Sequence, residues 1–551
     1  MVRPLEDEQK EENDAPHVNL GSPITRWLEI ALIFTVFFVV GGAPAPHVNE
    51  SYYLTKAKHY WEPQWCAGDP FLESADAHLV LYWTIGWLAK WFSLPTVAWI
   101  GRSTAWLLLA ISWQRLSSQV VRRPFFAVLT AMLFTTLIDK TNFAGEWVVG
   151  GVEGKCFAYA FVFWGLSALA AGRWRATWPW LGLAGAFHVL VGGWATLVAG
   201  LVWVTEPQKK RTPLLSMLPS LALGGVLALP GVVPALQLTQ GVSAETATEA
   251  NEIYVFERLS HHLAPLALPS KELLKKATRY GKLVIIFSLL WLLTRNKNEL
   301  KQEDSSGLNR SGLSRPALNR LMRFAWGSLA LSVFGLAWEL ATWNHPAQAA
   351  KLLKYYWFRL ADIAVPLAVA LAVGWLASVM LERRPKWAAL LLFVMVSFPA
   401  WILLDTSIVR YRNPIPPADR KMKDPLAWKE ACLWARKNTP SNALFLVPRG
   451  SQSFEWYAHR KGLVTWKDVP QDAASLISWR DRYFDVFARK EEKGSRRSFS
   501  SFADQGAGRI AKLAQKYQID YVITKEFPPL LLPAVYSNRA YRIYATTPLA
   551  P

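Results

Sequence analysis

Cysteine is scarce in this sequence, with three residues, Cys66, Cys156 and Cys432, in a chain of 551. So few thiols, none of them in a CxxC or Cys/His spacing, exclude a disulfide framework and indicate no structural zinc site. Cys66 and Cys432 could pair if both lie outside the cytoplasm. The alternative is that they are unpaired thiols of the interior.

Long apolar runs are absent after Asp405 but recur between Trp27 and Leu404. Each run is close to the ~20 residues that a helix needs to cross a bilayer. With 52% hydrophobic residues, 29 Trp and a mean hydropathy of +0.13, the composition is too apolar for an ordinary soluble protein. We therefore expect a membrane all-α polytopic bundle over 27–404, followed by a soluble α/β domain over 405–551.

The number of crossings follows from the positive-inside rule. When the N-terminal tail, 1–26, is cytoplasmic, about eleven crossings place every strongly basic loop in the cytoplasm and the α/β domain outside. The predicted crossings are 27–44, 97–115, 124–138, 156–171, 178–190, 191–204, 214–236, 281–294, 324–343, 360–380 and 387–404. The segment 78–92 contains Lys90 and is short for a span, so we predict an interfacial helix there.

Four polar loops then face the exterior, over 45–96, 139–155, 237–280 and 344–359. They are rich in ionisable groups, whereas the cytoplasmic loops are basic linkers. Charged groups at the membrane boundary are costly unless they are solvated, paired or used in a function. Four such loops on one face predict a shared polar cavity.

The order of residues in these loops resembles the GT-C superfamily of polytopic glycosyltransferases. The first outer loop of that family often reads Asp-Glu-x-x-Tyr, and Asn49-Glu50-Ser51-Tyr52-Tyr53 stands at that place. Glu153 stands where the family has a second acid, and Arg102 where an Arg opens the second crossing. Because Asn49 replaces the usual Asp, the resemblance implies that the catalytic role passes to Glu50 or is lost.

Family members transfer a sugar from a polyprenyl-phosphate carrier to an acceptor, so the resemblance implies a general base and cations for the leaving phosphate. Glu50 is the predicted base and Glu153 the second catalytic acid. The predicted substrate-binding residues are Asn49, Tyr53, Asp69, Asp76, Arg102, Lys155, Arg258, His261, His262, Lys351, Lys354 and Arg359. No motif indicates a cofactor, and a divalent cation is the one cofactor left open.

Structural roles are the alternative for several of these residues. The acids and one Arg could form ion pairs or helix caps, namely Glu50 with Lys56 or Lys58, Arg359 with Asp362, and Asp69 and Asp76 as N-caps. The adjacent His261 and His262 resemble half of a metal site, but the sequence identifies no third ligand.

The segment after Asp405 alternates predicted helices (424–440, 473–490, 506–518) with predicted strands (443–449, 521–526, 539–547), which is typical of an α/β domain. It lacks a Gly-rich phosphate loop, a nucleophile elbow and a triad spacing. We therefore expect a lid, an acceptor-binding module or an assembly module. Its excess of basic residues would favour anionic headgroups or glycans as partners.

The sequence thus predicts a glycosyltransferase of the plasma (inner) membrane, with a cytoplasmic N-terminus and an extracytoplasmic C-terminal domain. The expected partners are a polyprenyl-phosphate-linked sugar, an unidentified acceptor and the bilayer, and nucleic acid is not expected. One alternative is a non-catalytic protein that binds or moves a lipid-linked glycan, because the acid is missing at Asn49. The other is an ion-coupled transporter, which would need ionisable groups near the middle of the bilayer.

Overall fold

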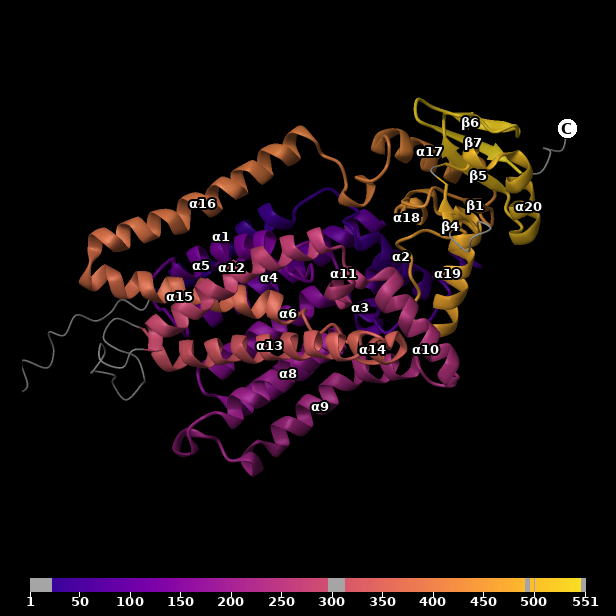
Figure 1. The fold of residues 1–551 in the computed structure, drawn as a ribbon. Coiled ribbons are helices and arrows are strands. Elements are labelled where there is room, and N and C mark those ends of the chain that lie inside the picture. The colour runs from indigo at the N-terminus through magenta and orange to yellow at the C-terminus, as the bar shows by residue number, and fades with distance from the viewer. Residues whose placement is uncertain (1–21, 296–312, 491–495, 500, 547–551) are drawn as a thin grey trace, which may run out of the picture.

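The computed structural model describes residues 22–295, 313–490, 496–499 and 501–546. Long helices form a bundle, and a small α/β unit packs against the end of the bundle that carries the outer loops (Figure 1). The fold class is therefore the predicted one. Most of the predicted N-terminal tail lies outside the described residues.

Every predicted crossing coincides with a helix of the bundle. These helices are α1 (Pro23–Gly41), α4 (Leu94–Ser117), α5 (Phe126–Thr141), α6 (Gly154–Ala170), α7 (Trp174–Phe187), α8 (Val189–Val204), α9 (Leu214–Gln237), α12 (Ser270–Arg295), α13 (Arg315–Ala341), α15 (Ala361–Arg383) and α16 (Pro385–Arg412). Among the described residues, seven helices are long and apolar enough to cross a membrane, namely α1, α4, α9, α12, α13, α15 and α16, and α6 and α8 are shorter apolar helices. The multi-pass character is confirmed, but the count of eleven is not.

Serine caps begin three of the long helices. The side chains of Ser22, Ser93 and Ser314 each accept the backbone N–H of the third residue that follows, and a proline stands in the first turn of each helix. Serine satisfies a free backbone donor at a helix start, and proline has no N–H to leave unpaired there. Local sequence therefore fixes where α1, α4 and α13 enter the bundle.

Short helices carry the outer loops. They are α2 (Glu50–Trp61), α3 (Leu79–Trp83), η2 (Gly86–Lys90), α10 (Ala244–Glu252), η4 (Ile253–Arg258), α11 (Ser260–Leu263), η5 (Pro265–Ala267) and α14 (Pro346–Leu353). The segment 78–92 forms α3 and η2, each of five residues. Neither helix is long enough to cross a bilayer, so the segment does not add a span.

The C-terminal unit is built on a five-stranded sheet of order β2-β1-β5-β7-β6. Its strands are β1 (Leu444–Leu446), β2 (Lys461–Gly462), β5 (Tyr521–Lys525), β6 (Ala534–Ser537) and β7 (Tyr541–Ala545), and β3 (Ala488–Lys490) and β4 (Arg496–Ser498) form a separate hairpin. Strand β1 pairs in parallel with β2 and β5, and β7 is antiparallel to β5 and β6.

Four main helices accompany this sheet, namely α17 (Pro425–Asn438), α18 (Phe454–Ala458), α19 (Ala473–Phe487) and α20 (Ala507–Tyr517). Short 3-10 turns lie at η7 (Pro417–Asp419) and η8 (Ala503–Gln505) in this part of the chain, and at η3 (Gln208–Lys210) between α8 and α9 of the bundle. The predicted helices and strands of the domain agree with these elements, but α18, β2, β6 and the hairpin were not predicted. The predicted domain boundary at 405 falls inside α16, which continues to Arg412.

Candidate functional site

One cavity of about 670 Å³ gathers residues from all four outer loops and from the C-terminal domain. Its apolar wall comes largely from the end of α9 and the tip of the α7–α8 hairpin. Its ionisable and amide side chains are Asn49, Tyr52, Tyr53, His78, Glu146, Glu153, Lys155, His188, Asn251, Tyr254, Arg258, His262, Lys354, Tyr355, Tyr356, Arg359, Lys467 and Gln471. Five Lys or Arg residues and two carboxylates therefore line it.

Lys155 lies between the two carboxylates of the cavity. Its Nζ is 3.0 Å from Oε1 of Glu153 and 3.6 Å from Oε2 of Glu146. The ammonium also lies 4.0 Å from the ring centre of Trp147, a favourable cation–π arrangement. All three ionised groups are buried. Because isolated buried charges are costly, this pairing holds them in place.

Asn49 completes the environment of Glu153. Its side-chain amide donates a 3.1 Å hydrogen bond to Oε2 of Glu153. The other oxygen, Oε1, is buried and accepts no hydrogen bond from the described residues. Glu153 therefore has one oxygen held by an amide donor and one whose single polar neighbour among the described residues is the Lys155 ammonium.

Arg359 connects the fourth outer loop, 344–359, with the second outer loop, 139–155. Its Nε lies 3.0 Å from Oε2 of Glu146, and Nη1 is 2.9 Å from Nε2 of His188 at the tip of the α7–α8 hairpin. Although burial opposes its charge, the adjacent Glu146 carboxylate raises the pKa of Arg359 further. The guanidinium is thus permanently charged at the cavity wall. The alternative pair with Asp362 is wrong.

Asp362 instead shapes the loop that carries Glu146. Its carboxylate accepts the backbone N–H groups of Phe143, Ala144 and Glu146 at 2.7, 2.8 and 3.3 Å. Several donors on one buried carboxylate fix the local backbone. The start of α15 therefore sets the position of Glu146.

The C-terminal domain adds two features to the cavity. Arg258 Nε donates to the carbonyl of Trp466 at 3.0 Å, and the guanidinium lies 5.0 Å from the Trp466 ring centre. Lys467, the next residue, lines the cavity directly. Burial, with the charge of Arg258 beside it, lowers the pKa of Lys467 to about 8.

Three tyrosine side chains line the cavity near these cations. The Tyr254 and Tyr356 hydroxyls are 3.0 Å apart, and the Tyr52 hydroxyl donates to the carbonyl of Val469 at 2.9 Å. The Tyr52 contact joins the first outer loop to the C-terminal domain. The domain therefore forms a wall of the cavity.

Of the predicted site residues, eight line this cavity, namely Asn49, Tyr53, Glu153, Lys155, Arg258, His262, Lys354 and Arg359. Six do not, namely Glu50, Asp69, Asp76, Arg102, His261 and Lys351. Burial and the neighbouring His261 hold the pKa of His262 well below its usual range, so it lines the cavity as a neutral imidazole.

Glu50 and Arg102 form a fully buried ion pair away from the cavity. Arg102 donates to both carboxylate oxygens of Glu50. The same oxygens also accept the backbone N–H groups of His47 at 2.7 Å and Val152 at 2.9 Å. With both oxygens occupied, Glu50 has no lone pair aimed at a substrate, and its alternative pairing with Lys56 or Lys58 is also not observed.

Asp69 and Asp76 support the first outer loop. Asp69 accepts the N–H groups of Phe71 and Leu72, as a capping residue does, and that of Gly462 in β2, each at 3.0 Å. Although burial opposes its charge, His78 and Lys56 hold the pKa of Asp76 well below its usual range. The Asp76 oxygens accept the backbone N–H of His78 at 2.7 Å and the Tyr82 hydroxyl at 2.6 Å. Both aspartates therefore bind the protein itself here, and their substrate-binding role stays a prediction.

His261 and Lys351 are exposed outside the cavity. The His261 ring lies against His262 in a tilted arrangement, with 4.0 Å between the ring centres and 42° between the ring planes. Within the residues that the structure describes, no three His, Cys, Asp or Glu side chains converge to hold a metal ion. The cysteines do not pair, since Cys66, Cys156 and Cys432 are all free and buried.

Sequence reasoning did not select Glu146, Tyr254, Tyr356 or Lys467, which line the cavity. The composition of loop 139–155 marked a polar segment but could not rank Glu146 above its neighbours. Lys467 follows a buried strand pattern in the other domain, and nothing local connects it with the membrane loops.

Comparisons with known proteins match both parts of the chain. A family model described as a domain of unknown function (DUF6798) matches residues 427–486. No curated protein matches the chain. The DUF6798 segment includes α19 and Lys467, so it contributes to the cavity wall.

Two kinds of solved structure are similar over most of the chain. One is the Archaeoglobus fulgidus oligosaccharyltransferase in complex with Zn and sulfate, at 13% identity and a TM-score of 0.45, with 90% of this chain and 67% of that chain covered. The archaeal oligosaccharyltransferase AglB with an inhibitory peptide and a dolichol-phosphate gives 12% identity and a TM-score of 0.42, with 90% and 69% covered.

The other is ArnT from Cupriavidus metallidurans bound to undecaprenyl phosphate, at 16% identity and a TM-score of 0.38, with 95% and 98% covered. Both kinds of neighbour are GT-C glycosyltransferases, the superfamily that the sequence resembles. With identities below 25% and TM-scores below 0.5, this likeness carries no argument about function. Function is therefore argued from the residues of the chain itself.

Proposed function

We propose that this protein is a GT-C-type membrane glycosyltransferase that takes a sugar from a polyprenyl-phosphate carrier and passes it to an acceptor in the cavity. The observation that carries the proposal is the Glu153 carboxylate, whose Oε1 meets only the Lys155 ammonium among the described residues, within a cavity that has five Lys or Arg residues and two carboxylates. The excess of three positive charges (5 − 2) favours a ligand with a phosphate.

The cations are arranged to hold a phosphate from more than one side. Arg258 and Arg359 offer N–H donors that suit phosphate oxygens, and Lys467 adds a point charge from the C-terminal domain. A phosphate that leaves the sugar would gain negative charge beside these groups. Preorganised cations at the place where charge develops are the main source of stabilisation in such a step.

The lipid part of the carrier fits the apolar wall. Leu236 lines the cavity and is 59% exposed on α9. Exposed leucines and valines continue along that helix, so its outer face suits lipid. A polyprenyl chain could therefore lie along α9 while its phosphate lies among the cations.

Glu153 is the proposed general base in place of Glu50. In the reaction, Oε1 of Glu153 takes the proton of the acceptor nucleophile, the nucleophile bonds to the anomeric carbon, and the carbon–oxygen bond to phosphate breaks. A single displacement of this kind inverts the anomeric centre. Positioned general bases typically contribute 10²–10⁴-fold to the rate.

Asn49 has a defined role in this arrangement. A carboxylate at that position would lie about 3 Å from Glu153 and would repel it, whereas the amide donates a hydrogen bond to it. The departure from the family pattern therefore leaves one carboxylate with an amide partner. The same departure favours a second candidate function. In that case the protein has lost catalysis and binds a lipid-linked glycan without transferring it.

Reconstituted transfer with Glu153→Gln distinguishes the two functions. We expect the parent protein to transfer sugar from a polyprenyl-phosphate donor, and the variant to bind the donor normally but to lose about 10²-fold or more in rate. Glu257→Gln is the matched control, since Glu257 is exposed in another outer loop, 237–280, and does not line the cavity. Full activity in Glu153→Gln would exclude Glu153 as the general base. Donor binding without transfer in the parent protein would establish the binding function.

A further inference from the structure

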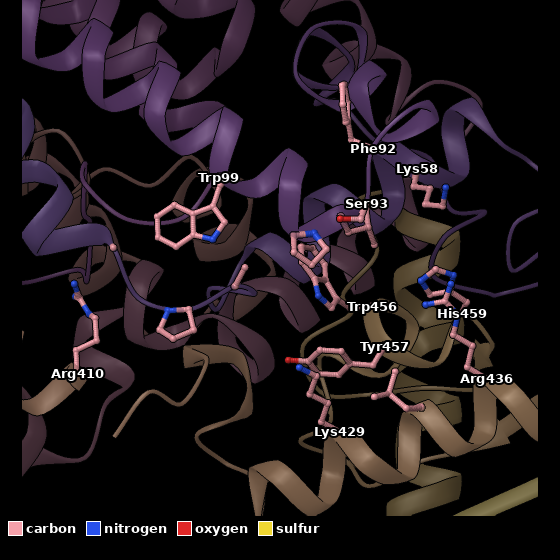
Figure 2. Close-up of a pocket in the computed structure, with 16 residues that line it drawn as sticks. Lys58, Phe92, Ser93, Trp99, Arg410, Lys429, Arg436, Trp456, Tyr457 and His459 are labelled. Atoms are coloured by element: carbon pink, nitrogen blue, oxygen red, sulfur yellow. The ribbon is translucent and has the colours of Figure 1, made fainter. Parts of the chain in front are cut away.

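A second cavity of about 680 Å³ lies at the junction of the bundle with the C-terminal domain (Figure 2). It shares no lining residue with the first cavity. Its walls come from the end of α1, the segment that leads into α4, the end of α16 and the helices α17 and α18. The lining residues are Gly42, Pro44, Ala45, Lys58, Phe92, Ser93, Leu94, Pro95, Trp99, Arg410, Lys429, Leu433, Arg436, Trp456, Tyr457 and His459.

Four Lys or Arg side chains line this cavity and no carboxylate does. Figure 2 shows Arg410 on one side, Lys429 beside Tyr457, and Arg436 and Lys58 on the other side. Lys58 is paired, because its Nζ lies 2.8 Å from Glu62. The other three are the cations available for a ligand.

Arg410, Lys429 and Arg436 have no carboxylate partner in the part of the chain that the structure describes. Arg410 donates to the carbonyls of Val39 at 2.7 Å and Val40 at 3.1 Å, which fixes the end of α16 against the end of α1. Lys429 Nζ lies 5.7 Å from the Tyr457 ring centre. Positive charge around a cavity without a counter-charge in its lining favours an anionic ligand.

The remaining lining is apolar and lies at the boundary of the membrane. Trp99, Leu433 and Trp456 form much of the surface between the cations. Phe92 lines the cavity and is 49% exposed, and its neighbour Trp91 is 67% exposed. Exposed aromatic side chains at the ends of membrane helices are typical of the headgroup layer. The cavity thus offers cations and apolar contacts at the depth where lipid headgroups meet acyl chains.

We propose that this cavity binds an anionic membrane phospholipid, with its headgroup on the side of α17 that carries Lys429 and Arg436 and the first part of its acyl chains against Trp99 and Leu433. Trp99 belongs to the bundle and both cations belong to α17, so the lipid would fasten the C-terminal domain to the bundle. This site is independent of the transfer reaction proposed for the first cavity, and its test uses no donor and no transfer assay.

The test is a titration of delipidated full-length protein in detergent with phosphatidylglycerol, followed by native mass spectrometry. We expect the double variant Lys429→Gln with Arg436→Gln to bind this lipid on the order of 20-fold more weakly, since each cation near a headgroup contributes about fivefold. The exchange variant Lys429→Arg with Arg436→Lys keeps both charges and should retain binding. Lys437→Gln with Lys512→Gln is the matched control, because both residues are exposed in the same domain outside the cavity.

Two competitors identify the ligand. Phosphatidylcholine should bind weakly to all variants, and soluble glycerol phosphate should not displace phosphatidylglycerol, because it lacks the acyl chains. Equal losses in the double variant and the matched control would show a general surface charge effect and overturn the site. Tight phosphatidylcholine binding, or displacement by glycerol phosphate, would overturn the assignment to an anionic lipid.

Discussion

Two acidic residues that the sequence places in one reaction have different surroundings in the structure. Glu50 is fully buried with Arg102 and two backbone donors, whereas Oε1 of Glu153 has one polar neighbour among the described residues, the Lys155 ammonium. A carboxylate with all its lone pairs occupied positions the chain, and one with a less occupied oxygen can accept a proton. The residues therefore differ in function although both follow the family pattern.

Glu50→Gln should therefore reduce stability. It leaves the Arg102 guanidinium buried without a counter-charge, which costs about 3–5 kcal/mol in the free energy of unfolding. Thermal unfolding in detergent measures the change. Glu62→Gln is the control, because the Glu62 pair with Lys58 is partly exposed and such pairs contribute about 0–1 kcal/mol. Unchanged stability in Glu50→Gln would contradict the structural role.

We expect the affinity for the polyprenyl-phosphate donor to depend on pH through Lys467. Burial, together with Arg258, lowers its pKa to about 8, below the usual ~10.4 of lysine. The unfolded chain therefore holds the proton more tightly, and the unfolding free energy should rise with pH between these values. A bound phosphate favours the charged form, so affinity for polyprenyl phosphate should fall as pH rises through about 8.

Two variants at this position separate charge from shape. Lys467→Arg stays charged across the range, so its donor affinity should not change with pH. Lys467→Met has no charge, so its affinity should be low at every pH by about 1.5–3 kcal/mol, the value of a charge-assisted hydrogen bond. Donor titrations at several pH values provide the measurement. The same pH dependence in both variants and the parent protein would exclude Lys467 from the phosphate site.

At the scale of elements, the helices of the bundle were predictable from local sequence. Apolar runs and serine caps such as Ser93 and Ser314 mark where helices lie and begin. The C-terminal end of α16 was not, because its last two turns contain Asp405 and Arg410 and continue beyond the apolar run. The strands β2 and β6 are short and gave too little alternation to be recognised.

The convergence of the loops was predictable but their pairing was not. Polar composition indicated that four loops share one face, and all four contribute to the cavity. That Glu146 pairs with Arg359, and that Asp362 holds the backbone at Ala144, depends on contacts between segments far apart in the chain. Such contacts follow from tertiary packing and leave no periodic signal in the sequence.

At the scale of the whole molecule, the short loops at the end opposite the C-terminal domain carry runs of basic residues (Figure 1). These runs are Arg122-Arg123 between α4 and α5, Lys209-Lys210-Arg211 between α8 and α9, and Arg383-Arg384 where α15 ends and α16 begins. Basic residues at one end of a membrane bundle favour the cytoplasmic side. The cavity and the C-terminal domain would then lie outside the cytoplasm.

Cysteine labelling tests this topology. In a background without Cys66, Cys156 and Cys432, single cysteines at Gln208 and at Lys512 should react with a membrane-impermeant reagent from opposite sides. Gln208 lies between α8 and α9, and Lys512 is exposed on α20. Intact cells should label position 512 alone, and permeabilised cells both. Labelling of both positions in intact cells would contradict the orientation.

The central claim is that the first cavity holds the phosphate of the carrier, and a structure with bound polyprenyl phosphate tests it most directly. We expect the phosphate within hydrogen-bond distance of Arg258, Arg359 or Lys467, with the polyprenyl chain along α9 and Glu153 facing the position of the sugar. A phosphate bound beside Lys429 and Arg436 instead, or a carrier that leaves the first cavity empty, would contradict the account.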